Sequence, residues 1–156
     1  MDITIKTLED KLLVGMAWTG PYGRGSEIPL LFARFQEMIP TIQHLSGDAC
    51  ILAPFHDRAT DFTYYCTVEV DRVEHLHPDL VELSLPAGEY AHSLYDGNSS
   101  EVEQAYFSIF NWIKENGYEK DYSRLSVEKY LEQDREINQT QEKRKLELFV
   151  PIKKKS

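Results

Sequence analysis

The chain has few of the features that bind nucleic acid or cross membranes. Its 156 residues include 17 Lys and Arg against 26 Asp and Glu, which gives a formal net charge of −9. Because affinity for phosphates depends mainly on clustered Lys and Arg, this balance argues against a nucleic-acid-binding surface. No apolar run approaches the roughly 20 residues of a membrane span, and the N-terminus (MDITIKTLED) lacks a signal-peptide core. We therefore expect a cytoplasmic protein without direct nucleic-acid or membrane contacts.

Cysteine is also scarce, and metal-ligand spacings are missing. Cys50 and Cys66 lie in apolar segments and not in a CxxC arrangement, which favours buried, reduced thiols. His75 and His77 could hold a metal only with a third ligand on the same strand face, and a pair at a loop rim is the simpler interpretation. No P-loop, dinucleotide fingerprint or Ser-His-Asp order occurs. We therefore expect neither a metal nor a cofactor.

Apolar periodicity predicts two amphipathic helices among β-prone runs. In the first helix, apolar residues recur at spacings of three and four after Ser26, a good N-cap, and Pro40 should kink or end the helix. In the second, Ser100 and Glu103 form a capping box and Gly117 should terminate the helix. With 42% hydrophobic residues, the chain can bury one core, so a single domain is expected.

The same order of elements occurs twice. The first unit comprises residues 13–20, a helix, 50–55 and 62–70, and the second comprises 89–97, a helix, 126–131 and 145–152. This pattern predicts an α+β fold in which residues 1–156 form one domain of two pseudo-twofold β-α-β-β repeats, about 1–77 and 78–156. The sheet would be mainly antiparallel, with both helices on one face and a ligand groove on the other. The polar segment 132–144 is predicted to be a long loop or a short surface helix.

Alternation along the strands selects the side chains of the helix-free face. On the last strand Leu146 and Leu148 suit the core, so Glu147 points the other way. Overlaying the last strands of the two units places Glu147 opposite Tyr65. For residues 89–95, two assignments remain open: either Tyr90, His92 and Leu94 or Ala91, Ser93 and Tyr95 face the groove.

The predicted groove collects carboxylates and aromatic rings. Its members are Glu147, Glu128, Tyr65, Tyr130 and Phe149, with Trp18 and Tyr22 at the rim. Carboxylates alone would be ordinary solvated side chains, but exposed rings beside them serve no solvation purpose. An acidic floor among rings suits a flat, cationic or electron-poor ligand, which gains cation–π attraction and charge pairing.

Several segments resemble the GyrI-like small-molecule-binding domain, which is also the effector-binding domain of AraC-type and multidrug-responsive bacterial regulators. They are PAGEYAHSLYDG at 86–97, FNWIKENGY at 110–118, VEKYLE at 127–132 and LELFVPI at 146–152. The resemblance implies two β-α-β-β repeats around a central ligand groove. It also implies that Glu147 occupies the place of a buried Glu that contacts lipophilic cations, and that Glu128 matches an acidic position on the preceding strand.

The resemblance implies three kinds of function. Similar proteins serve as effector domains fused to DNA-binding modules, protect gyrase from toxins, or hydrolyse cyclopropane-bearing DNA-alkylating toxins. The repeats use almost the whole length, so we expect a stand-alone domain, a monomer or weak dimer, acting alone or with a partner regulator or gyrase. The favoured prediction is sensing or sequestration of small hydrophobic, often cationic aromatic molecules. The alternatives are a detoxifying hydrolase that uses Glu147 as base and Tyr65 as proton donor, and a gyrase-protecting protein.

Overall fold

The computed structural model describes residues 2–46, 50–131 and 143–155. Its strands are β1 (Ile3–Leu8), β2 (Lys11–Pro21), β3 (Leu52–Asp57), β4 (Asp61–Val70), β5 (Val81–Leu85), β6 (Gly88–Asn98), β7 (Tyr118–Lys120), β8 (Ser126–Tyr130) and β9 (Lys143–Lys154). Its helices are α1 (Ile28–Met38) and α2 (Val102–Glu115), with 3-10 turns η1 (Tyr22–Glu27), η2 (Ile39–Thr41) and η3 (Ser99–Glu101).

In the described part of the chain, the strands form one antiparallel sheet in the order β1-β6-β9-β8-β3-β4-β2-β5, and β7 pairs with the end of β9. The order is symmetric about the β3–β8 seam, since β6, β9 and β8 on one side correspond to β2, β4 and β3 on the other. The outer strands are exchanged: β1 precedes β2 in the chain but pairs with β6, and β5 precedes β6 but pairs with β2. The predicted α+β fold with a mainly antiparallel sheet is therefore confirmed.

The first helix ends close to Pro40, as the sequence predicted. Helix α1 stops at Met38, and Pro40 lies in the short 3-10 turn that follows. Its N-cap is Glu27, and no side-chain hydrogen bond caps it. The prediction of Ser26 as N-cap is therefore wrong, because the 3-10 turn η1 runs through this segment and delays the start of α1.

The second helix also begins after a 3-10 turn. Turn η3 precedes α2, so the N-cap is Glu101 and no side-chain cap is formed. The predicted capping box of Ser100 and Glu103 is therefore wrong. Gly117 follows α2 with a φ of 80°, a left-handed conformation that ends the helix as predicted.

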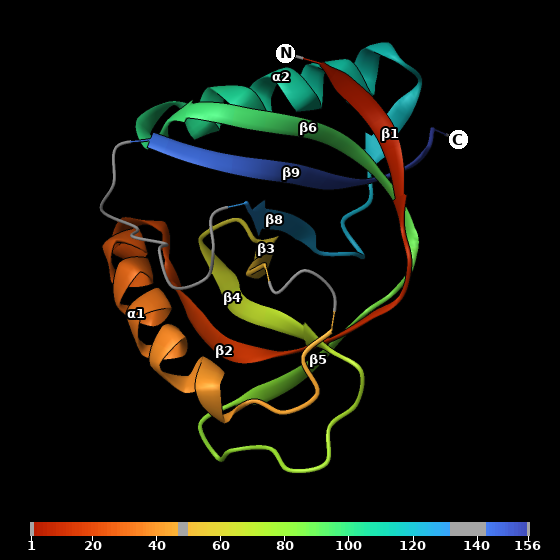
Figure 1. The fold of residues 1–156 in the computed structure, drawn as a ribbon. Helices are drawn as coiled ribbons and strands as arrows, with labels where there is room; N and C mark the ends of the chain where they lie inside the picture. Colours follow the sequence, from red (N-terminus) through yellow and green to blue (C-terminus); the bar gives the residue numbers. More distant parts are fainter. Residues whose placement is uncertain (1, 47–49, 132–142, 156) are drawn as a thin grey trace.

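Both helices pack on one face of the sheet, where they share a large core (Figure 1). Helix α2 contacts β6 and β7, and α1 contacts β2 and β4. The helix-free face has a smaller core of its own, made of Leu13, Leu52, Leu85, Tyr90, Val127 and Phe149. The sheet therefore buries side chains on both faces, and it curls so that β6 and β9 lie above β2 and β4 in Figure 1.

Of the polar segment predicted as a loop or short helix, residues 132–142 lie outside the described residues, whereas Lys143 and Arg144 begin β9. No helix in the described part of the chain is long and apolar enough to cross a membrane. Within the same residues, no group of three or more His, Cys, Asp or Glu side chains is placed to hold a metal ion.

Candidate functional site

The predicted site residues fall on opposite faces of the sheet. Glu147 and Phe149 lie on the helix-free face, where Phe149 joins the smaller core together with Val127. Tyr130 belongs to the core under the helices, and Glu128, two residues earlier on β8, shares its face. The prediction that Glu128 and Tyr130 share a face with Glu147 is therefore wrong. Both faces of the sheet are packed, so Val127 can lie in the smaller core on the helix-free face. Glu128 and Tyr130 then lie on the face under the helices.

The Glu147 carboxylate is already surrounded by basic groups. Its Oε1 lies 2.8 Å from His92 Nε2 and 3.5 Å from Lys6 Nζ, and its Oε2 lies 3.9 Å from Lys129 Nζ. The ammonium of Lys6 also lies 5.9 Å from the centre of the Phe149 ring. The side chain of Glu147 is 16% exposed. The negative charge of Glu147 is therefore already compensated, and a cationic ligand would have to displace two lysines or bind beside their positive charges.

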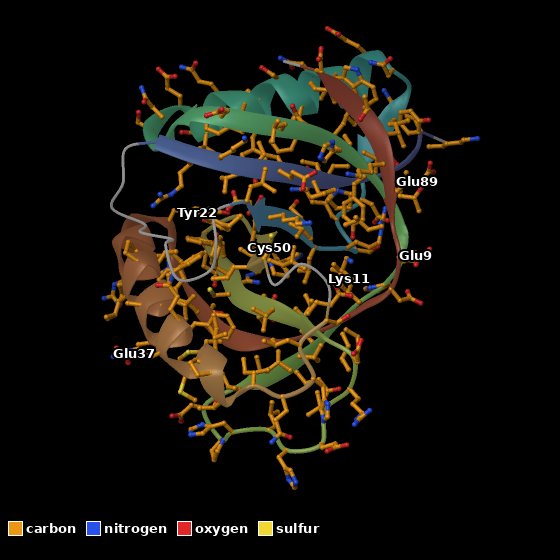
Figure 2. All side chains as sticks on the ribbon, in the orientation of Figure 1. Glu9, Lys11, Tyr22, Glu37, Cys50 and Glu89 are labelled. Carbon is orange, nitrogen blue, oxygen red and sulfur yellow. The ribbon has the colours of Figure 1, made fainter. Side chains whose placement is uncertain are left out.

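The cavity beside Glu147 is small, at about 90 Å³. Lys11 and Cys50 also line it, and both lie inside the curve of the sheet in Figure 2. The neighbouring strand β6 turns His92 toward Glu147 and Tyr90 into the smaller core. Of the two open assignments for residues 89–95, the structure therefore supports the one with Tyr90, His92 and Leu94 on this face.

Tyr65 shares the helix-free face with Glu147 but is not its neighbour. Strands β8 and β3 lie between β9 and β4, and the row across the sheet from Glu147 runs through Lys129 and Leu52 to Thr67. Three strand spacings separate the two backbones by roughly 14 Å. Tyr65 is a further two residues along β4, so the predicted pair is not assembled as one acid–base unit.

The predicted rim residues gather around a third ring. The Trp18 ring centre lies 5.0 Å from that of Phe62, and the Tyr22 ring stacks on Phe62 at 5.1 Å. The Tyr22 hydroxyl donates a 2.6 Å hydrogen bond to the carbonyl of Arg58. Trp18 packs against the core under the helices. These rings therefore stabilise the end of the β2–β4 pair and do not contact Glu147.

A different constellation forms around Glu128, under the helices. Tyr64 on β4 donates a 2.9 Å hydrogen bond to Glu128 Oε1, and Tyr106 on α2 donates a 2.7 Å hydrogen bond to Oε2. The Tyr64 hydroxyl also lies 3.1 Å from that of Tyr130. A strand from each half of the sheet and a helix therefore converge on one carboxylate.

Further aromatic rings enclose this group. Phe32 on α1 meets the Tyr130 ring edge-on at 5.0 Å, and Phe55 on β3 lies 6.1 Å from Tyr64 and 6.0 Å from Tyr106. Phe110 stacks on Tyr106 one helical turn further along α2. The carboxylate is thus surrounded by ring faces and edges that can pack against a flat or bulky apolar ligand.

Burial controls the electrostatics of this site. Desolvation raises the pKa of the Glu128 carboxyl, the hydrogen bonds from Tyr106 and Tyr64 partly oppose this effect, and the negative charge of Asp57 adds to it. Burial also raises the pKa of Tyr64 and of Tyr106 well above the usual value for a phenol. No ion pair to Glu128 occurs among the described side chains, where its partners are phenols. Glu128 is therefore a partly buried carboxyl without a counter-ion in this part of the chain.

A cavity of about 230 Å³ adjoins the constellation and is lined by residues of α2, β3 and β8. It is lined by Phe55, Asp57, Glu103, Tyr106, Phe107, Phe110 and Ser126. Tyr106 both lines the cavity and binds Glu128, so it separates the carboxylate from the opening. Typical ligand pockets measure about 300–1,000 Å³, so a bulky ligand would need Tyr106 or the exposed Phe107 to move aside.

Tyr64 and Tyr106 were not among the site residues predicted from the sequence. A signal was available there, because a buried phenol usually needs a hydrogen-bond partner. Two core-facing tyrosines on different elements therefore imply a polar group between them, and Glu128 is that group.

Solved structures with the same fold include EcmrR in a complex with DNA, with a TM-score of 0.78 and 17% identity. The match covers 99% of this chain but only 58% of the EcmrR chain. SAV2435 bound to tetraphenylphosphonium has a TM-score of 0.70 and 21% identity, with 98% and 94% of the two chains covered. A hydrolase encoded by lin2189 from Listeria innocua has a TM-score of 0.60 and 15% identity, with 97% and 91% covered. At these identities the likeness establishes the fold alone.

No curated protein matches the sequence. The family described as the GyrI-like small molecule binding domain matches residues 1–153, almost the whole chain. The resemblance seen in the four sequence segments is thereby confirmed, and the chain belongs to the GyrI-like small molecule binding domain family.

Proposed function

We propose that this domain binds small hydrophobic molecules that carry a positive charge, with Glu128 as the charged centre of the site. The observation that carries this proposal is a partly buried carboxyl held by two phenols and without a counter-ion among the described side chains. Membership of a small-molecule-binding family supports it. So does the fold shared with SAV2435, which was solved with the lipophilic cation tetraphenylphosphonium.

The physical basis is the cost of burying a charge. An ionised carboxylate in an apolar site is unfavourable unless it is paired, so desolvation raises the pKa of Glu128. A cation that enters restores the pairing, and the rings of Phe32, Phe55 and Tyr64 offer it contact area and cation–π attraction. Charge and apolar area together select lipophilic cations over both neutral oils and hydrophilic salts.

Glu147 is the weaker candidate for the same role. It has the position on the last strand that the family resemblance implies, but two lysines and a histidine lie within 4 Å of its carboxylate. A cation at Glu147 would meet Lys6 and Lys129 at close range, whereas at Glu128 it would meet tyrosines. As a binding domain, the protein would serve to sense or sequester drugs and other foreign aromatic molecules.

A hydrolase that ring-opens cyclopropane-bearing alkylating toxins is the second candidate. Glu128 favours it, because a carboxyl with a raised pKa beside two phenols can orient a water molecule and accept a proton from it. The same constellation would then supply the base from Glu128 and the proton from Tyr106. The earlier assignment to Glu147 and Tyr65 would require two groups with strands β8 and β3 between them to act on one substrate.

Calorimetric titration with a shape-matched ion pair tests the binding proposal. Tetraphenylphosphonium should bind the wild-type domain, and tetraphenylborate, an anion of nearly the same shape, should not. Glu128→Gln should abolish cation binding, and Glu147→Gln should retain it. Equal binding of both ions would refute recognition by charge. Loss of binding in Glu147→Gln alone would move the site to the helix-free face.

Mass spectrometry separates binding from turnover. A cyclopropane-bearing alkylator is incubated with the domain, and the ring-opened product is counted against the protein. Product in molar excess over protein, lost in Glu128→Gln, would establish the hydrolase. Product no greater than in the protein-free control would leave binding as the function of the site.

A further inference from the structure

The ammonium group of Lys120, at the end of β7, lies among one carboxylate and two aromatic rings. Its Nζ lies 3.3 Å from Asp57 Oδ2, 5.4 Å from the centre of the Phe110 ring and 5.0 Å from that of Tyr122. The side chain of Lys120 is only 13% exposed, although lysine is among the residues least often buried. We call Asp57, Phe110 and Tyr122 the Lys120 clasp.

The Lys120 clasp lies between two cavities. Asp57 and Phe110 line the cavity of about 230 Å³ beside the Glu128 constellation. Phe110, Lys120 and Tyr122 line a second cavity of about 410 Å³, together with Ile113, Lys114, Glu119 and Lys153. Of these rim lysines, Lys153 pairs with Glu119 at 3.7 Å. The ammonium of Lys120 therefore lies where one cavity meets the other.

Asp57 and Glu128 act on each other electrostatically, since the charge of Asp57 raises the pKa of Glu128. With Lys120 in the clasp, these two carboxylates and one ammonium carry a single net negative charge when both acids are ionised. With Lys120 displaced, the same region carries two. The position of the Lys120 side chain thus determines whether the net charge of the region complements a ligand with one positive group or with two.

We propose that the Lys120 clasp is a second cation subsite, which the chain's own lysine fills when no ligand is bound. A ligand with two positive groups, such as a diamine or a bis-quaternary ammonium compound, would place one at Glu128 and the other in the clasp. The Glu128 end rests on the function proposed above, whereas the clasp does not. Displacement is feasible because Asp57 is 39% exposed, and partly exposed ion pairs are weak.

Chemical rescue tests the clasp by itself. Lys120→Ala removes the propylammonium part of the side chain, so added n-propylammonium should refill the space and raise Tm. At about ten times its Kd the rise should be about 3–6 °C. Neither n-propanol nor NaCl at the same concentration should produce this rise in Tm. The n-propylammonium ion should not raise the Tm of the wild type or of the double variant Asp57→Asn/Lys120→Ala. Lys120→Gly with n-butylammonium repeats the test in a second variant. Identical responses to the ion and to n-propanol in both variants would overturn the subsite.

A chain-length series tests the link between the two subsites. Alkane-α,ω-bis(trimethylammonium) ions are titrated against the matching alkyltrimethylammonium ions. At one spacer length the bis-cation should bind wild type about tenfold more tightly, and Lys120→Ala should widen that ratio. Equal affinities at every length in both proteins would overturn the two-site arrangement. If none of these trimethylammonium ions binds either protein while n-propylammonium still rescues Lys120→Ala, the Glu128 proposal fails and the clasp stands.

Discussion

Replacing Tyr106 with Phe removes one of the two O–H groups that donate to Glu128. A hydrogen bond to a charged acceptor contributes about 1.5–3 kcal/mol, and its loss leaves one carboxylate oxygen without that donor. For a chain of this size, 1 kcal/mol lowers Tm by about 2–4 °C. We therefore expect Tyr106→Phe to lower Tm by about 3–12 °C at a pH at which Glu128 is ionised.

The cost should depend on pH in a defined direction. Burial raises the pKa of Glu128 above its ordinary value of 4.5, so the folded state holds this proton more tightly than the unfolded state. The resulting stabilisation is fully present below pH 4.5 and is lost as the pH rises through the raised pKa. The bond from Tyr106 lowers that pKa and limits the loss. The destabilisation by Tyr106→Phe should therefore grow with pH across this window.

Thermal unfolding from pH 4 to 8 measures this dependence. Tyr122→Phe is the matched control, because Tyr122 is 69% exposed and its replacement should change stability by less than about 0.5 kcal/mol. In a Glu128→Gln background, the Tyr106→Phe cost should shrink and lose its pH dependence. A cost that is constant from pH 4 to 8, or that persists in full without the Glu128 carboxyl, would refute the reasoning.

Two further predictions concern the packing of the sheet. Gly15→Ala should destabilise the domain by about 3 kcal/mol, because an added Cβ would overlap the backbone carbonyl of Cys66, whereas Gly23→Ala meets nothing within 4 Å and should be nearly neutral in the same urea titration. Phe149→Ala should cost about 3–5 kcal/mol, because this ring is 2% exposed in the helix-free core, whereas Phe107→Ala, with 56% exposure, should cost far less. Similar midpoints within either pair would contradict the packing described.

The order of elements was predictable from the sequence, because each helix and most strands carry their own periodicity. Gly117 and Pro40 marked the helix ends correctly, since both act through local backbone geometry. The helix starts were not predictable in this way, because the 3-10 turns η1 and η3 displace the residues that would otherwise cap them.

The candidate site was only partly predictable. Alternation along β8 correctly separates Val127 from Glu128 and Tyr130, but it does not say which set lies under the helices. On a sheet with one packed face, the apolar residue Val127 would show which side of β8 lies under the helices. Here a second core on the helix-free face accepts Val127, and the phenols of Tyr64 and Tyr106 supply the partners that let Glu128 lie on the other side. Which side of β8 faces the helices therefore depends on tertiary contacts.

The exchange of β1 and β5 has a consequence for how the domain holds together. Strand β1 pairs with β6 along Ile3 to Leu8, and β5 pairs with β2 along Val81 to Leu85. A fragment of either half would leave one of these strands without a partner and expose an edge that invites association with other chains. Unfolding should therefore be all-or-none, and the two halves, expressed as separate polypeptides, should recover a native sheet only when mixed.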